Sequence, residues 1–189
     1  MGTKASLSTT RAAQIWTEMV ELRRELYKDD CFFKMHEPWE QFTTESDLWS
    51  IKTYRSENQE EYKQKASVVE FDGRVTLTVD EVLLSRAREG GQLENFILAH
   101  EWCHLALRHH ANFASNRNFV LSSTDKGYAR LAGDIFELEA DFGAVVFQCG
   151  VALRDERWDS VRLAKRAYAD VAAVKKVRRL VNLEVFERE

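Results

Sequence analysis

The chain has little of what marks several large classes of protein. It contains one proline, Pro38, and eight glycines among 189 residues, so few positions interrupt regular structure and a helix-rich chain is expected. No apolar run reaches the roughly 18 residues that a membrane-spanning helix needs. The first residues show no apolar segment of the kind found in secretory signals. We therefore expect no association with a membrane.

The cysteines and the net charge exclude further classes. Cys31, Cys103 and Cys149 are an odd number at wide spacing, which indicates reduced thiols of a cytoplasmic protein rather than a disulfide framework. The net charge of -4 argues against a dedicated nucleic-acid-binding protein, since such proteins are usually basic. What remains is an ordinary globular composition, long enough for one domain or one domain with an extension.

The hydrophobic pattern predicts an α+β fold. A hairpin is expected over Ser67–Val79, because alternating apolar residues lie on both sides of the turn dipeptide Asp72-Gly73. The stretch 29–65 is expected to hold one or two short helices. Other helices are predicted by spacing over Thr9–Lys28, Glu81–Glu89, Leu93–His110 and Tyr128–Cys149, with one or two more between Asp159 and Glu189.

A division into a main domain, residues 1–150, and a C-terminal helical extension, residues 151–189, follows from this pattern. The extension is basic within an acidic chain. Its cations are Arg162, Lys165, Arg166, Lys175, Lys176, Arg178 and Arg179. They could serve substrate docking or a helix-turn-helix-like role, or form a solvated helical face; direct contact with DNA is not expected.

One motif carries recognisable chemistry: H-E-x-x-H, formed by His100, Glu101 and His104. Residues four apart on a helix share a face, so both imidazoles can bind one metal ion, and zinc suits them. Glu101 follows the first ligand, where its carboxylate can take a proton from the attacking water and pass it to the leaving amine. The flanking residues are mostly apolar, and buried histidines are costly unless a metal satisfies them. The alternative is a core helix with incidental histidines.

A third protein ligand is expected downstream, because catalytic zinc usually has three. Glu137 and Asp141 are four apart, so Glu137 can bind the metal while Asp141 accepts the outer N–H of a ligand histidine. Glu139 lies about 200° from Glu137 around the helix, so the two cannot both bind the same ion. Glu137 is the expected ligand because it alone has a partner at i+4, and Glu139 is the alternative. These acids could instead form a solvated helix face.

Transition-state stabilisation has several candidates. His109 and His110 could polarise a substrate carbonyl or stabilise the tetrahedral intermediate, and Tyr128 and Arg130 are comparable candidates. The two histidines could equally be partly exposed residues that interact with the helix dipole.

The segments that hold these candidate residues, together with the strand Val75–Val79, resemble segments of the ImmA/IrrE metallopeptidases. Val75–Val79 and Glu94–His109 are similar to the family's strand of type I-x-V-N and its helix of type R-F-T-L-A-H-E-x-x-H-x-x-L-H. Glu137–Ala144 is similar to the E-x-x-A-N-x-F-A helix that supplies the third ligand, and Leu163–Leu180 to the family's tail. Trp102-Cys103 departs from the usual small or aliphatic pair.

The resemblance implies a zincin fold, thermolysin-like, with one Zn²⁺ held by His100, His104 and Glu137 and with Glu101 as the general base. The implied activity is that of a zinc metalloendopeptidase, a hydrolase that cleaves a protein or peptide substrate such as a repressor. In such folds an edge strand receives the peptide, and Val75–Val79 is the expected strand.

Two alternatives stay open from the sequence. The departure at Trp102-Cys103 leaves room for a catalytically silent zinc-binding regulator of a phage or mobile element. Asp141 also departs from the family, in which asparagine is common at that position. Iron or manganese could also occupy a site of two histidines and one carboxylate, and only the peptidase motif favours zinc.

Overall fold

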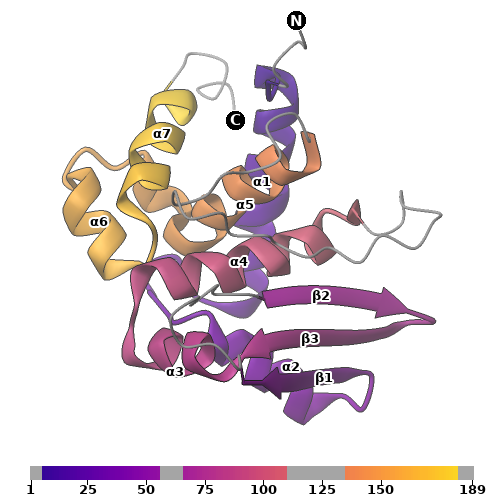
Figure 1. Cartoon of the computed structure of the whole chain (residues 1–189). Coiled ribbons are helices and arrows are strands. Elements are labelled where there is room, and N and C mark those ends of the chain that lie inside the picture. The colour runs from indigo at the N-terminus through magenta and orange to yellow at the C-terminus, as the bar shows by residue number, and fades with distance from the viewer. Residues whose placement is uncertain (1–5, 56–65, 110–134, 183–189) are drawn as a thin grey trace, which may run out of the picture.

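A computed structural model describes residues 6–55, 66–109 and 135–182, which form helices around a small mixed sheet (Figure 1). The predicted α+β class is therefore confirmed for this part of the chain. In chain order the elements are α1 (Thr9–Leu26), α2 (His36–Glu45), β1 (Trp49–Tyr54), β2 (Ala66–Phe71), β3 (Arg74–Asp80), α3 (Glu81–Glu89), α4 (Gln92–Ala106), α5 (Ile135–Cys149), the 3₁₀ turn η3 (Gly150–Leu153), α6 (Ser160–Arg166) and α7 (Val171–Val181).

The predicted hairpin is present as β2 and β3. The two strands pair antiparallel, and the register brings Phe71 opposite Arg74 across the turn. Asp72 and Gly73 both have positive φ, 50° and 71°, as a tight two-residue hairpin turn requires. The dipeptide thus determines both the position of the turn and which side chains of each strand face the core.

The strand expected at the edge of the sheet lies at its centre. The order is β1-β3-β2, so β3 pairs with β2 on one side and runs parallel to β1 on the other. The prediction of Val75–Val79 as the edge strand was wrong, because β1 forms within the stretch 29–65, for which only one or two short helices were predicted. The alternation of Trp49 and Ile51 with polar residues was the signal for this strand. On the side of the sheet next to α4, the edge strand is β2.

Helix ends follow local capping. The Ser8 hydroxyl oxygen accepts a hydrogen bond from the Arg11 N–H at the start of α1, and Asp80 caps α3 in the same way. Helix α3 ends at Gly90, whose φ of 95° suits glycine. Helix α4 ends at Ala106, four residues before the predicted end at His110. The predicted residues 128–134 of the next helix lie outside the described residues.

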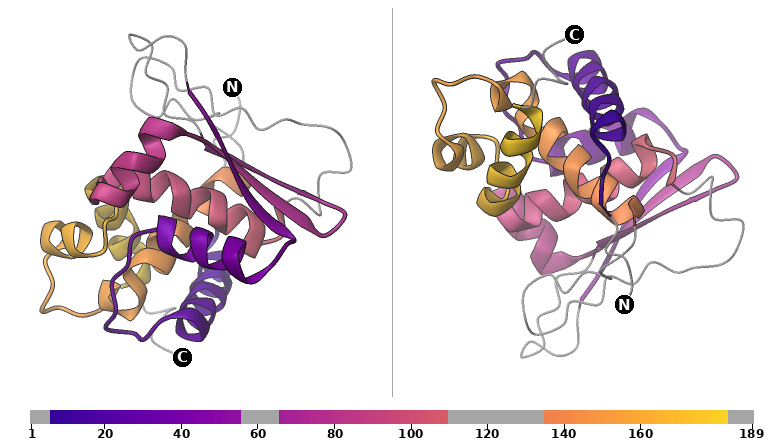
Figure 2. Two further views of the ribbon diagram at one scale, coloured as in Figure 1. Left: turned by 90° about the horizontal axis from the view of Figure 1, so that it is seen from below. Right: turned by 90° about the horizontal axis from the view of Figure 1, so that it is seen from above.

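The metal-motif helix occupies the middle of the molecule. Every residue of α4 from Glu94 to His104 is buried, and α5 is buried along most of its length. Helices α1 and α7 both pack against α5, and the views of Figure 2 place α6 and α7 on the side away from the strands. A single apolar cluster runs from Ala12 to Val181; the domain boundary at residue 150 stays a prediction. None of the described helices is long and apolar enough to cross a membrane.

Candidate metal centre

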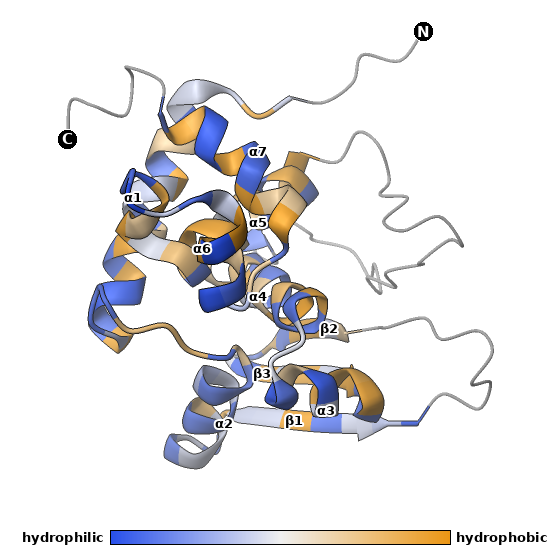
Figure 3. Cartoon of the chain, turned by 90° about the vertical axis from the view of Figure 1, so that its left-hand side faces the viewer, coloured by the Kyte–Doolittle hydropathy of each residue, from blue (hydrophilic) through white to orange (hydrophobic). Residues whose placement is uncertain are grey.

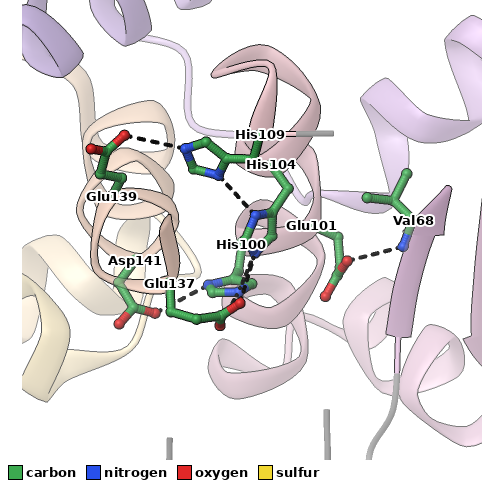
Figure 4. Close-up of polar contacts among 8 residues, drawn as sticks. All are labelled: Val68, His100, Glu101, His104, His109, Glu137, Glu139 and Asp141. Atoms are coloured by element: carbon green, nitrogen blue, oxygen red, sulfur yellow. Dashed lines mark hydrogen bonds and ion pairs between the residues drawn. The ribbon is translucent and has the colours of Figure 1, made fainter. Parts of the chain in front are cut away.

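Helices α4 and α5 lie side by side and bring three donor groups together (Figure 4). The Nε2 atoms of His100 and His104 are 3.0 Å apart. Glu137 places Oε2 3.2 Å from His100 Nε2 and Oε1 3.4 Å from His104 Nε2. Within the described ranges these residues form the one group of three or more histidine, cysteine or acidic side chains that could hold a metal ion.

The spacing of these donors fits zinc. Four ligands arranged tetrahedrally at zinc-to-ligand distances of about 2.0–2.1 Å lie about 3.3 Å from one another. The three separations here, 3.0, 3.2 and 3.4 Å, bracket that value. Two imidazole nitrogens and one carboxylate are also the donor types found in catalytic zinc sites.

His100 is oriented by the acid predicted to do so. Its Nδ1 lies 3.1 Å from Asp141 Oδ1, so the carboxylate can accept the ring N–H and direct Nε2 toward the donor group. Burial alone would lower the pKa of His100, but the hydrogen bonds to Asp141 and Glu137 raise it to about 10. A metal ion therefore has to displace a proton from His100 in order to bind.

Glu137 is anionic, as a ligand must be. Burial opposes its ionisation, but hydrogen bonds from His100 and His104 outweigh that effect and hold the pKa of Glu137 well below its usual value. Glu139, two residues later, faces a different group of side chains, in agreement with the angular argument from the sequence.

Glu101 lies on the flank of α4 that faces the sheet. Its Oε2 accepts a hydrogen bond of 3.0 Å from the backbone N–H of Val68 in β2 (Figure 4). Burial raises the pKa of Glu101 to about 7, although the neighbouring His100 acts to lower it. A carboxylate that titrates near neutrality can both accept and return a proton, which suits a general base.

His109 occupies a position that the sequence did not indicate. After Leu107, Arg108 adopts a left-handed backbone with φ of 54°, and the chain turns back beside α4. His109 Nδ1 then lies 2.9 Å from His104 Nδ1. This is the ring nitrogen of His104 opposite the one that faces His100, so His109 lies behind this histidine. Its contact with a substrate carbonyl stays a prediction. The candidates His110, Tyr128 and Arg130 lie outside the described residues.

The other ring nitrogen of His109 also has a hydrogen-bond partner. Its Nε2 lies 3.2 Å from Glu139 Oε2, and the same oxygen accepts a hydrogen bond of 2.7 Å from Arg11 Nη2. Burial would raise the pKa of Glu139, but Arg11 and His109 lower it. Burial and the charge of His104 lower the pKa of His109 to about 4, which leaves the imidazole neutral. Arg11 was not among the predicted site residues.

The unusual pair Trp102-Cys103 points into the core. Trp102 packs edge-on against Trp39 and stacks on Phe147. Cys103 is fully buried against Gly143 of α5, where an added Cβ would lie 3.2 Å from its Sγ. Trp102 and Cys103 therefore belong to the core packing, and neither is part of the group His100, His104 and Glu137.

Comparisons with models of protein families, with curated proteins and with solved structures gave no match for this chain.

Proposed function

We propose that the chain is a zinc-dependent endopeptidase with a zincin-like fold, of the ImmA/IrrE type. The observation that carries the proposal is the convergence of His100, His104 and Glu137 at mutual distances suited to one zinc ion, with Glu101 on the same helix. Buried polar groups have to be satisfied by hydrogen bonds or by an ion, and one zinc ion would coordinate all three.

Each site residue has a distinct task in this proposal. Bound zinc would act as a Lewis acid that polarises the scissile carbonyl and lowers the pKa of a water molecule. Glu101 takes the proton of the attacking water and returns it to the leaving amine. The Val68 N–H fixes the orientation of that carboxylate, and Asp141 fixes that of His100.

Strand β2 supports a peptide as the proposed class of substrate. Among the described residues no strand pairs with its outer edge. The Val68 N–H points outward from the sheet to Glu101, and by strand alternation the backbone groups of Ala66 and Glu70 point the same way. An extended peptide can add to such an edge and lie beside Glu101. This supports a protein or peptide substrate over a small molecule.

The test compares the wild type with Glu101→Gln. Zinc content is measured by mass spectrometry, and cleavage is measured against a mixture of unstructured peptides. Both proteins should bind one zinc ion, while the variant should cleave about 10²–10⁴-fold more slowly, because a general base typically contributes that factor.

Glu94→Gln is the matched control, since Glu94 is a buried acid on the same helix that pairs with Arg86. It should retain both zinc and cleavage. A wild type without metal would refute the proposal. A wild type that binds zinc but cleaves nothing would favour the silent zinc-binding regulator instead.

A further inference from the structure

His100 and His104 differ in what contacts their Nδ1 atoms, which face away from the candidate metal position. His100 contacts one carboxylate, that of Asp141, at 3.1 Å. His104 contacts a series of three side chains, in which His109 lies at 2.9 Å, Glu139 contacts His109 at 3.2 Å, and Arg11 contacts Glu139 at 2.7 Å. Figure 4 shows His109 between His104 and Glu139.

A metal ion on His104 would fix the order of donors and acceptors along this series. If Nε2 of His104 binds a metal, its Nδ1 carries the hydrogen and donates it. His109 must then accept at Nδ1 and carry its own hydrogen on Nε2, which donates to Glu139 Oε2. The Arg11 guanidinium donates to that same oxygen. The series therefore selects one tautomer for each imidazole, the one in which His104 presents Nε2 to the metal.

The backbone conformation that brings His109 to His104 is energetically unfavourable. His109 reaches His104 only because Arg108 leaves the helical conformation for a left-handed one, which is unfavourable for a residue with a side chain. His109 and Glu139 are both buried, at 1% and 6% exposure. Arg11 comes from the first turn of α1, which packs on α5.

We propose that His109, Glu139 and Arg11 are positioning residues for the metal ligand His104, and that through Arg11 the N-terminal helix contributes to metal affinity. This inference rests on the proposed zinc site, but the two can fail separately. It predicts that loss of Arg11, a residue remote from the donors, weakens metal binding without removing a ligand.

The decisive measurement is zinc affinity by competition with a chromophoric chelator. His109→Phe, which removes both hydrogen bonds, should weaken zinc binding about 10–100-fold, the usual effect of losing a residue that orients a ligand. His109→Asn should lose less, because the asparagine side-chain oxygen takes the place of imidazole Nδ1 and can accept from His104. Arg11→Met should lose less than His109→Phe. Arg24→Met, on the same helix but paired with the exposed Asp29, should be unchanged.

Two further readouts separate positioning from simple folding. The melting temperatures of the metal-free proteins should stay close together, and the visible spectrum of the cobalt-substituted protein should change in His109→Phe but not in Arg24→Met. If zinc affinity falls only in those variants whose metal-free stability also falls, the positioning role is overturned. Equal zinc affinity in wild type and His109→Phe would also overturn it, but that result would leave the peptidase proposal intact. A wild type that binds no zinc would overturn both.

Discussion

Helices α4 and α7 differ in the exposure of their ionisable residues. On α4, His100, Glu101 and His104 are 6%, 3% and 4% exposed. On α7, Lys175 and Lys176 are exposed, and the hydrophilic bands alternate with apolar ones along the helix (Figure 3).

The difference separates charges that water can solvate from polar groups that need a partner within the protein or a ligand. Water solvates the exposed Lys175 and Lys176. Arg178 is half-buried and donates hydrogen bonds to the backbone carbonyl oxygens of Leu153, Asp155 and Trp158. Val174, Val177 and Val181 bury the apolar face of the helix. The polar groups of α4 have to be satisfied by one another or by a ligand. The exposed lysines of α7 are therefore accounted for by an ordinary surface helix, whereas the buried histidines of α4 belong to the candidate metal centre.

The largest effect is expected from removing one of the proposed metal ligands on α4. His100→Ala and His104→Ala should each abolish zinc-dependent stabilisation, since two remaining donors hold zinc poorly. In the wild type, free zinc at 100 times its dissociation constant should add about 2.7 kcal/mol to the free energy of unfolding. Thermal melts with zinc and with a chelator measure this. An equal shift in wild type and variants would show that zinc binds elsewhere.

The second test uses pH. The pKa of His100 is raised to about 10 in the metal-free protein, so below that pH a metal ion competes with a proton. Zinc affinity should thus rise by about tenfold per pH unit between pH 6.5 and 8.5, for one displaced proton. Chelator competition at three pH values, corrected for the chelator's own protonation, measures the slope. A flat profile would mean that His100 is already unprotonated before zinc binds.

A third test concerns the contact between α4 and α5. Gly143→Ala places a Cβ 3.2 Å from Cys103 Sγ, and neither helix has free space there. Overpacking typically costs about 1–3 kcal/mol, and the better helix propensity of alanine returns about 1 kcal/mol. The net loss in the free energy of unfolding should be about 1 kcal/mol, measured by urea denaturation. Greater stability would indicate that the two helices can separate at no cost.

The smallest effect is expected on α7. Lys176→Ala removes an exposed cation and should change the free energy of unfolding by less than about 0.5 kcal/mol, as surface substitutions usually do. It should leave zinc affinity unaltered. A larger loss in the same urea experiment would show that α7 uses its cations for more than solvation.

The parts of the site that the sequence predicts are those within one or two turns of a helix. His100 and His104, and likewise Glu137 and Asp141, are four residues apart, so helical geometry alone sets their shared faces. The hairpin was predictable for a similar reason, since Asp72-Gly73 determines its turn.

What the sequence could not predict depends on distant or irregular contacts. Arg11 and Glu139 are 128 residues apart, and no periodic pattern links them. The return of His109 to His104 requires the left-handed Arg108, which sequence spacing does not indicate. The pairing of β1 beside β3 is parallel and non-local, so its effect, the central place of β3, appears only in the folded chain.

The hydrogen bond between Val68 and Glu101 has a consequence for how a peptide would bind along β2. One backbone amide donates one hydrogen bond, so while Val68 holds Glu101 it is not available to a substrate carbonyl. The outward amides that remain are those of Ala66 and Glu70, about 13–14 Å apart in an extended strand. A peptide would then accept amide hydrogen bonds from β2 at two points with an interval between them, and the carboxylate of Glu101 lies in that interval.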